Sequence, residues 1–395
     1  MRTLKVLFYT PNEVSPQKGG TERITASISF ALQQYFGVEC YSMYSFDIDS
    51  IYEKTPFKAK IKIANLKKEK ERLYEFILNY DIDIIVNQGF FSYSSIFHEV
   101  LQEFNGKYLV FVHHFNPGAE INFLLFHAYW LELKQKKSVF KNIIKMAIYP
   151  FRKFLFQKNL PIIYRNTYNM VDRFVLLSSH FIDDFVNFSS VKHTDKIRVI
   201  HNALSYNSFF DMRLYVCKKK EVLIVSRLEE CQKRISLALK IWEYIEKDSN
   251  LEDWTLNIVG SGLDEFQYKN YVYSHSLKRV KFHGIQNPIS YYKNASIFMM
   301  TSAFEGWGLT LTEAQQYACV PIAFNSYKSL SDIITDGENG YIVPNDDIDE
   351  FVSYLKRLML GDNLRQKMAN TAVESSHRFE VKKIAGDWMQ LFNGL

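Results

Sequence analysis

Two glutamates eight residues apart flank a glycine-rich turn in the stretch FEGWGLTLTEA, residues 304–314. The run SIFMMTS before it has the composition of a buried strand, so Glu305 falls in the loop at that strand's carboxyl end. A helix beginning there leaves its first N–H groups, those of residues 309–311, without intrahelical partners and available to an anion. Glu313, one turn further on, can accept hydrogen bonds from two neighbouring hydroxyls, as a ribose offers. On spacing alone, a loop carboxylate and a first-turn glutamate favoured by the helix dipole explain the pattern equally well.

Charge and glycine also follow other predicted strands. The run EVLIVSRL carries Arg227 near its end, and Lys233 follows six residues later, before a helical pattern. These two cations can neutralise a diphosphate, although a solvated charged loop is the other interpretation. Near the amino terminus, Gly19 and Gly20 stand directly before a helical pattern, where a phosphate can approach backbone N–H groups; the same pair also suits a plain turn.

The elements that must position these residues form two series of short apolar runs separated by longer helical patterns. The first series is KVLFYT, DIDIIVNQ, KYLVFVHH, RFVLLSS and IRVIHN, and the second is EVLIVSRL, WTLNIVGSG, VKFHG, SIFMMTS, VPIAF and GYIV. Each series predicts an α/β domain in which helices cover both faces of a parallel sheet. Residues 203–220 have no clean periodicity and are interpreted as a linker.

A chain of 395 residues exceeds what one hydrophobic core usually serves, which agrees with two domains. We predict a first doubly wound, Rossmann-like domain over residues 1–203 and a second over residues 204–379. A helix at about 380–395 is expected to pack back on the first domain. Ligand sites then lie at the carboxyl ends of the strands, facing each other across a cleft.

Composition indicates an ordinary soluble globular protein: 47% of the residues are hydrophobic, 23% are charged and the formal net charge is +5. No apolar run is long enough to span a bilayer, and the opening MRTLKVLFYTPNE is typical of a first strand rather than a secretory signal. The four cysteines are scattered without CxxC spacing, which favours reduced thiols over disulfides or a zinc site. We therefore expect a cytoplasmic protein.

The stretch SAFEGWGLTLTEA resembles the glutamate-x7-glutamate motif of retaining GT-B glycosyltransferases, and the chain as a whole resembles glycosyltransferase family 4. The runs KGGTE, IRVIHNA, IVSRLEECQK, IVGSG, VKFHG and DGENGYIVP follow one another in the family's order. The likeness covers nearly the whole chain, but it is loose over residues 40–180. It implies a GT-B fold in which residues 1–203 form the acceptor-binding domain and residues 204–379 form the domain that binds a nucleotide-sugar donor. Two positions depart from the pattern, because Arg234 and Ala318 stand where the family usually has glycine.

Carried over residue by residue, the resemblance implies a donor site. Arg227 and Lys233 would grip the diphosphate of a nucleotide sugar. Glu305 would contact the donor sugar, and Glu313 would bind the ribose hydroxyls. The remaining donor-binding positions would be Gly308, Leu309, Thr310 and Leu311, with Gly19 and Gly20 from the opposite domain. No metal or other cofactor is expected, because the nucleotide sugar is a substrate and the carboxylates are binding groups rather than an acid/base pair.

A histidine close to the donor sugar is usual in the family, at the end of a strand in the first domain. The run KYLVFVHHFNPGAE offers His113 and His114 there, and His114, three residues before Pro117, is the preferred match. Outside this resemblance, a lone histidine at a strand end is most often structural.

The resemblance thus implies a retaining, metal-independent hexosyltransferase. It would move a hexosyl unit from a nucleotide diphosphate sugar, with UDP favoured over GDP, to a saccharide or lipid-linked saccharide acceptor in surface polysaccharide biosynthesis. Catalysis would rest on front-face displacement in which the leaving diphosphate helps to take the acceptor proton. Two other interpretations remain, a non-catalytic GT-B partner or chaperone of another transferase and a GT-B epimerase or phosphorylase. Lys233 is expected to be exposed and to contribute little to folding stability.

One further segment, residues 133–159, is basic and aromatic and contains no acidic residue after Glu132. Its cations are Lys134, Lys136, Lys137, Lys141, Lys145, Arg152, Lys153 and Lys158. Such a segment can lie on an anionic bilayer, which would place the protein peripherally on the inner face of the cytoplasmic membrane. The alternative is a helix pair, interrupted at Pro150, with an apolar face in the core and solvated lysines. Nucleic-acid binding is not expected, because no recognised module is present.

Overall fold

The structure, a computed structural model, describes residues 2–15, 19–47, 55–121 and 139–395, with the backbone alone for residues 139–146. The chain divides into two compact units, Met1–Ser205 together with Glu380–Leu395, and Tyr206–Phe379. The first boundary between the units follows Ser205, whereas the sequence predicted it after residue 203. The last helix belongs to the first unit.

The first unit is built around a parallel sheet, which has seven strands in its described residues, in the order β3-β2-β1-β4-β5-β6-β7. The strands are β1 (Lys5–Asn12), β2 (Glu39–Phe46), β3 (Lys60–Lys62), β4 (Ile84–Asn87), β5 (Tyr108–His113), β6 (Arg173–Leu176) and β7 (Ile197–Val199). β4 is buried throughout, as expected of a parallel strand covered on both faces. The strand order reverses between β1 and β4, and sheets of this type bind ligands at the carboxyl ends of the strands at that point.

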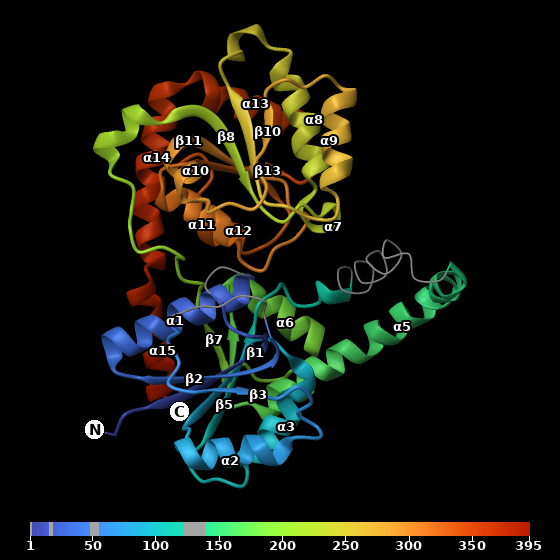
Figure 1. Ribbon diagram of the computed structural model, residues 1–395, viewed down its shortest axis with the longest axis vertical. Helices are drawn as coiled ribbons and strands as arrows, with labels where there is room; N and C mark the ends of the chain where they lie inside the picture. Colours follow the sequence, from blue (N-terminus) through green and yellow to red (C-terminus); the bar gives the residue numbers. More distant parts are fainter. Residues whose placement is uncertain (1, 16–18, 48–54, 122–138) are drawn as a thin grey trace. The chain divides into compact units, whose positions relative to one another are not determined.

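Helices cover this sheet: α1 (Gly20–Phe36), α2 (Lys70–Tyr80), α3 (Phe91–Leu101), α5 (Val139–Met170), α6 (Ile182–Ser189) and α15 (Val381–Asn393). Right-handed crossovers place α1 on one face and α2, α3, α5 and α6 on the other. α15, from the far end of the chain, packs against α1 (Figure 1). Its buried Trp388 lines a small hollow together with Ile24 and Ile28 of α1, so α15 completes the core of the first unit.

α5 is the longest helix of the described chain, and it continues through Pro150 and Pro161. The interruption expected at Pro150 is therefore not present. Proline removes one backbone hydrogen bond, and an exposed helix can turn the freed carbonyl towards water. The amino-terminal part of α5 runs outward from its sheet, whereas Leu160, Tyr164 and Tyr168 further along are buried (Figure 1). Within the described ranges, no helix combines the length and the apolarity needed to cross a bilayer.

The second unit has a parallel sheet with six strands among its described residues, in the order β10-β9-β8-β11-β12-β13. The strands are β8 (Lys219–Val225), β9 (Thr255–Val259), β10 (Val280–Phe282), β11 (Ala295–Met300), β12 (Val320–Asn325) and β13 (Tyr341–Pro344). The helices are α7 (Glu230–Lys233), α8 (Ile235–Glu246), α9 (Glu265–Ser274), α10 (Ile289–Asn294), α11 (Leu309–Gln316), α12 (Leu330–Ile333), α13 (Ile348–Leu360) and α14 (Asp362–Ser376). Here the strand order reverses between β8 and β11.

The two parallel sheets with flanking helices confirm the predicted doubly wound α/β class. β2 and β3 were not predicted. In β2, Ser42 and Ser45 occupy buried positions, so the hydrophobic signal of the strand is weak. The segment interpreted as a linker contains a short 3₁₀ helix, Met212–Cys217, and the first residues of β8.

Candidate functional site

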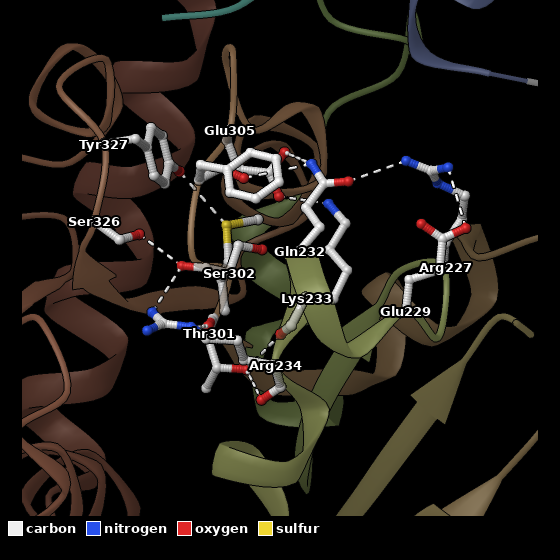
Figure 2. A network of polar contacts seen from close by, with 12 residues as sticks. Arg227, Glu229, Gln232, Lys233, Arg234, Thr301, Ser302, Glu305, Ser326 and Tyr327 are labelled. Atoms are coloured by element: carbon white, nitrogen blue, oxygen red, sulfur yellow. Dashed lines mark hydrogen bonds and ion pairs between the residues drawn. The ribbon is translucent and has the colours of Figure 1, made fainter. Parts of the chain in front are cut away.

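Two loops of the second unit meet at the carboxyl edge of its sheet. β8 and β11 are hydrogen-bonded neighbours, so the loops that follow them, residues 226–234 and 301–308, lie side by side (Figure 2). The loop after β9 joins them at Gly260, which has a φ of 130°. A Cβ atom there would lie 1.9 Å from the Ser226 carbonyl oxygen, so only glycine allows this approach.

Lys233, at the end of α7, donates a hydrogen bond from Nζ to Oε1 of Glu305 in the loop after β11. Only 15% of the Lys233 side chain and 10% of the Glu305 side chain are exposed. The expectation of an exposed lysine with little effect on stability is therefore wrong, because removing Lys233 would leave a largely buried carboxylate without its charge partner. Glu305 is the one partner found for Nζ in the described chain, so two of the three ammonium donors remain for a ligand.

Gln232 links this ion pair to Arg227. Its amide nitrogen lies 3.4 Å from Oε2 of Glu305, and its amide oxygen accepts a hydrogen bond from Arg227 at 3.0 Å. The Arg227 side chain is 62% exposed and also contacts Glu229 at 3.3 Å. We refer to Arg227, Gln232, Lys233 and Glu305 as the polar cluster (Figure 2). It begins with a buried ion pair and ends at a guanidinium that is open to solvent.

Arg234 ties the same two loops together. Its guanidinium donates to the carbonyl oxygens of Thr301 at 2.8 Å and Ser302 at 3.0 Å, and to Oδ1 of Asn345 at 2.9 Å. Arg234 has a φ of 46°, and Ala318, the other departure from the family pattern, has a φ of 58°. Both positions thus keep the left-handed conformation that glycine favours, which costs a residue with a side chain about 1–2 kcal/mol. At Arg234 the hydrogen bonds to the second loop offset that cost.

The amino terminus of α11 supplies the backbone part of the predicted site. Gly308 caps the helix with a φ of 93°, and a Cβ atom there would lie 2.8 Å from the Tyr327 hydroxyl. The N–H groups of Leu309 and Thr310 are the first two of the helix. No preceding turn of the helix supplies a carbonyl group to accept their hydrogen bonds, so they can bind an anion. The Leu311 N–H donates to the Gly308 carbonyl at 2.9 Å. The prediction of three unpaired amides is therefore wrong for Leu311.

Glu313 lies on α11 and is fully buried. Its Oε2 atom accepts a hydrogen bond from the Tyr292 hydroxyl of α10 at 2.9 Å. Since the side chain has no exposed surface, a ligand can meet it only if neighbouring side chains shift. The contact with ribose hydroxyls stays a prediction.

The site residues predicted in the first unit lie at the carboxyl edge of its own sheet. Gly19 has a φ of 69° and caps α1, which begins at Gly20, and both glycines are exposed. The loop residues 16–18 that precede them lie outside the described residues. The approach of these glycines to a phosphate stays a prediction.

His113 and His114 follow one another at the end of β5 but have different surroundings. His113 is buried, and its Nε2 lies 2.9 Å from the Tyr164 hydroxyl. His114 is partly exposed, and its Nε2 lies 2.7 Å from Oε1 of Gln88, at the end of β4. Burial lowers the pKa of both imidazoles to about 3, so both are neutral near pH 7. Of the two, His114 has the larger exposed surface.

The geometry joins Arg227, Lys233 and Glu305 through Gln232 in one hydrogen-bonded cluster. It leaves Gly19, Gly20 and His114 in the first unit. Sequence reasoning misses Gln232 and Tyr292, because an amide or a phenol gives no signal of a partner that is distant in the chain. The signal that could have pointed to Gln232 is its place directly before Lys233, at the carboxyl end of a strand.

Several solved structures align with almost the whole chain. The apo form of the lipopolysaccharide outer core galactosyltransferase WaaB aligns with a TM-score of 0.69 and 19% identity, covering 99% of this chain and 100% of that one. Anabaena HepE in complex with UDP-glucose aligns with a TM-score of 0.70 and 16% identity, again covering 99% of this chain and 100% of that one. Likeness at these identities establishes the fold, and the fold is GT-B.

A family model matches the second unit. Residues 214–375, which include both loops of the polar cluster, match the model Glycosyl transferases group 1. Among the curated relatives, the amylovoran biosynthesis glycosyltransferase AmsD of Erwinia amylovora is 28% identical over 231 residues, 57% of this chain and 63% of its own length. The lipopolysaccharide 1,6-galactosyltransferase of Salmonella typhimurium is 31% identical over 175 residues, 42% of this chain and 47% of its own length. The chain thus spans about half to two thirds of these relatives.

Proposed function

We propose that this chain is a retaining, metal-independent hexosyltransferase of the family 4 type. It moves a hexosyl unit from a UDP-sugar to a saccharide or lipid-linked saccharide acceptor in surface polysaccharide biosynthesis. The observation that carries the proposal is the Lys233–Glu305 ion pair with its link to Arg227, at the point where the strand order reverses and within the residues of the family match. The relatives' names support it, since they specify amylovoran biosynthesis and lipopolysaccharide galactosyl transfer, and HepE binds UDP-glucose.

The polar cluster supplies the donor contacts in this proposal. The two remaining ammonium donors of Lys233 and the exposed guanidinium of Arg227 bind diphosphate oxygens. The N–H groups of Leu309 and Thr310 donate to the same anion. Glu305, held in place by Lys233 and Gln232, accepts from a hydroxyl of the donor sugar. Glu313 accepts from the ribose once the side chains around it shift.

Electrostatic stabilisation is the main protein contribution to the reaction. Negative charge grows on the diphosphate as the bond to the anomeric carbon breaks, and cations fixed beforehand stabilise it without reorganising. The leaving oxygen takes the proton of the acceptor hydroxyl, which attacks from the same face. The anomeric configuration is thereby retained, and no protein nucleophile is required. The proposed role of His114 beside the donor sugar is to present a neutral imidazole.

A peripheral position on an anionic membrane is part of the proposal. In the described part of the segment 133–159, Ile148, Phe151, Phe154 and Leu155 are exposed on α5. Arg152, Lys153 and Lys158 lie among them, and Lys158 Nζ stands 4.7 Å from the centroid of the Phe154 ring. Lys134, Lys136 and Lys137 lie outside the described residues, as do the side chains of Lys141 and Lys145. Exposed apolar side chains among cations suit the interface of an anionic bilayer.

Nucleotide binding and transfer test the proposal in sequence. UDP should raise the melting temperature of the chain more than GDP or ADP does, because a ligand that binds only the folded state stabilises it by mass action. The UDP-sugar selected in this way should then be transferred to lipid-linked saccharides at a rate that a metal chelator leaves unchanged, with an α-linked product from an α-linked donor by NMR. Absence of stabilisation by every nucleoside diphosphate would overturn the proposal, and inversion would overturn the mechanism.

A further inference from the structure

The first unit contains a cavity of about 300 Å³ where the loops after β4 and β5 meet α5. We refer to it as the α5 cavity. Its walls are mainly apolar: Phe90, Phe91, Phe115, Phe156, Leu160 and Ile163. Its volume lies at the low end of the range of about 300–1,000 Å³ for small-molecule sites, which suits one sugar ring with a short apolar portion. Its position at the carboxyl ends of parallel strands is where ligands bind in such sheets.

A buried hydrogen-bond network meets the α5 cavity. Glu120 and His113 line it, and both are bonded to the buried hydroxyl of Tyr164. Tyr164 donates to Oε1 of Glu120 and lies 2.9 Å from Nε2 of His113. Its ring stacks on Phe91 with centroids 4.7 Å apart, which holds the wall and the network in one arrangement.

One atom of this network lacks a partner. Oε2 of Glu120 makes no hydrogen bond within the described chain, although the residue is only 7% exposed. Burial also raises the pKa of this carboxyl group. A buried carboxyl oxygen without a donor is costly, and such atoms in folded proteins call for an explanation such as a ligand. A hydroxyl group that enters the α5 cavity would supply the missing donor.

The apolar wall continues out of the cavity along α5. Ile163 lines the cavity and is still 38% exposed, and Leu155 and Ile162 of the same helix are exposed as well. An apolar group longer than the cavity could therefore leave along the exposed apolar side chains of this helix. This continuity favours a ligand with one polar end and an apolar tail.

We propose that the α5 cavity binds a glycoside with an apolar aglycone. A hydroxyl of its sugar donates to Oε2 of Glu120, and its aglycone lies on Phe156, Leu160 and Ile163. Identifying this glycoside as the glycosyl acceptor rests on the proposed function, whereas the binding itself does not. Glu120 is then a positioning residue for the acceptor sugar.

The test is an NMR titration of the full chain with n-octyl β-glucoside, kept below its micelle concentration, and with methyl β-glucoside. Octyl glucoside should bind at least about 10-fold more tightly, because its alkyl chain leaves water. Phe156→Ala should weaken binding of octyl glucoside about 10-fold and leave methyl glucoside unchanged. Glu120→Gln keeps an oxygen for Tyr164 but replaces the free acceptor by an NH₂ group, so both glucosides should bind more weakly.

The matched control is Phe30→Ala, a phenylalanine that is exposed on α1 of the same unit and does not line the cavity. It should leave both affinities within about twofold of the wild type. Equal affinity for the two glucosides, or an equal loss in Phe30→Ala and Phe156→Ala, would overturn the proposal. UDP binding measured on the same samples separates the two proposals. Retained UDP binding without glucoside selectivity would overturn only the α5 cavity, and glucoside selectivity without UDP binding would overturn only the proposed function.

Discussion

At the scale of single residues, the ion pair between Lys233 and Glu305 has two roles that a substitution would mix. It holds the loop after β8 to the loop after β11, and it aims an ammonium group at the position proposed for the diphosphate. A change in activity at either residue therefore has to be separated from a change in stability.

Lys233→Ala should lower transfer about 10²-fold or more, as the loss of a charge-stabilising group does. It should also lower the free energy of unfolding by about 3 kcal/mol, because Glu305 is left buried without its partner. The double variant Lys233→Met/Glu305→Gln removes both charges and should regain most of that stability while staying inactive. Urea unfolding and initial rates on the three proteins measure both effects. Wild-type activity in either variant would remove Lys233 from the site.

Glu313→Gln should weaken the binding of UDP and of the UDP-sugar alike, because both contain the ribose. Glu305→Gln should spare UDP and weaken the complete donor, because only the latter contains the sugar. Calorimetry measures the affinity of each variant for UDP and for the UDP-sugar. The affinity of Tyr292→Phe for UDP then shows how far the position of Glu313 depends on the Tyr292 hydroxyl. The same loss for both ligands in both glutamate variants would contradict these assignments.

Stability should fall with acid because of the histidines after β5. Burial lowers the pKa of His114 from 6.5 to about 3, so the unfolded chain binds a proton between these values and the folded chain does not. The wild type should thus lose at most about 1.4 kcal/mol per pH unit for each of these two histidines as the pH falls below 6.5. Replacing His114 by Gln removes one such group, and shared groups cancel in the comparison. Urea unfolding at pH 7 and pH 5 measures the free energy of unfolding of both proteins. From pH 7 to pH 5 the variant should lose less of this free energy than the wild type, and an equal loss would contradict the prediction.

The sequence was enough to predict those site residues that are charged and follow a clear strand. Arg227, Lys233 and Glu305 each follow a strand whose apolar run is plain. The burial of Lys233 and Glu313 could not be predicted, because it depends on partners 72 and 21 positions away. The Leu311 amide was missed for a local reason, since the first turn of α11 closes a tighter hydrogen bond to Gly308.

At the scale of elements, the apolar runs of the central strands predicted both sheets. β2 was not predicted because its buried serines weaken the hydrophobic pattern of the strand. β3 was not predicted because three residues are too few to show a periodic pattern. α5 is an exception to the rule that proline ends a helix, because it continues through Pro150 and Pro161. In its exposed part the carbonyl groups that lose their partners can turn to water, so the sequence alone could not decide between one helix and two.

α5 also gives the element-scale prediction, vesicle binding. The variant Arg152→Gln/Lys153→Gln/Lys158→Gln should bind anionic vesicles about 10²-fold more weakly than the wild type, since each cation near the surface contributes about 1 kcal/mol. UDP binding should not change, because the polar cluster lies in the other unit. Flotation with anionic and neutral vesicles at two salt concentrations measures the effect. A wild type that stays unbound at low salt with strongly anionic lipid would contradict the membrane part of the proposal.

At the scale of the whole molecule, the two units contribute different parts of the proposed activity. The family match and the polar cluster lie in the second unit, and the α5 cavity lies in the first. The sequence predicted that the chain contains two α/β units, because the second series of strands and helices repeats the pattern of the first. Variants in the α5 cavity and in the polar cluster should therefore affect different ligands.

Hydrogen–deuterium exchange of the full chain with and without saturating UDP tests the central claim most directly. The account predicts slower exchange in residues 226–234 and 301–313, which contain both loops of the polar cluster and the start of α11, and no such change in Lys233→Ala at the same UDP concentration. Absence of protection in these residues, or protection there that persists undiminished in Lys233→Ala, would show that the polar cluster does not bind the donor.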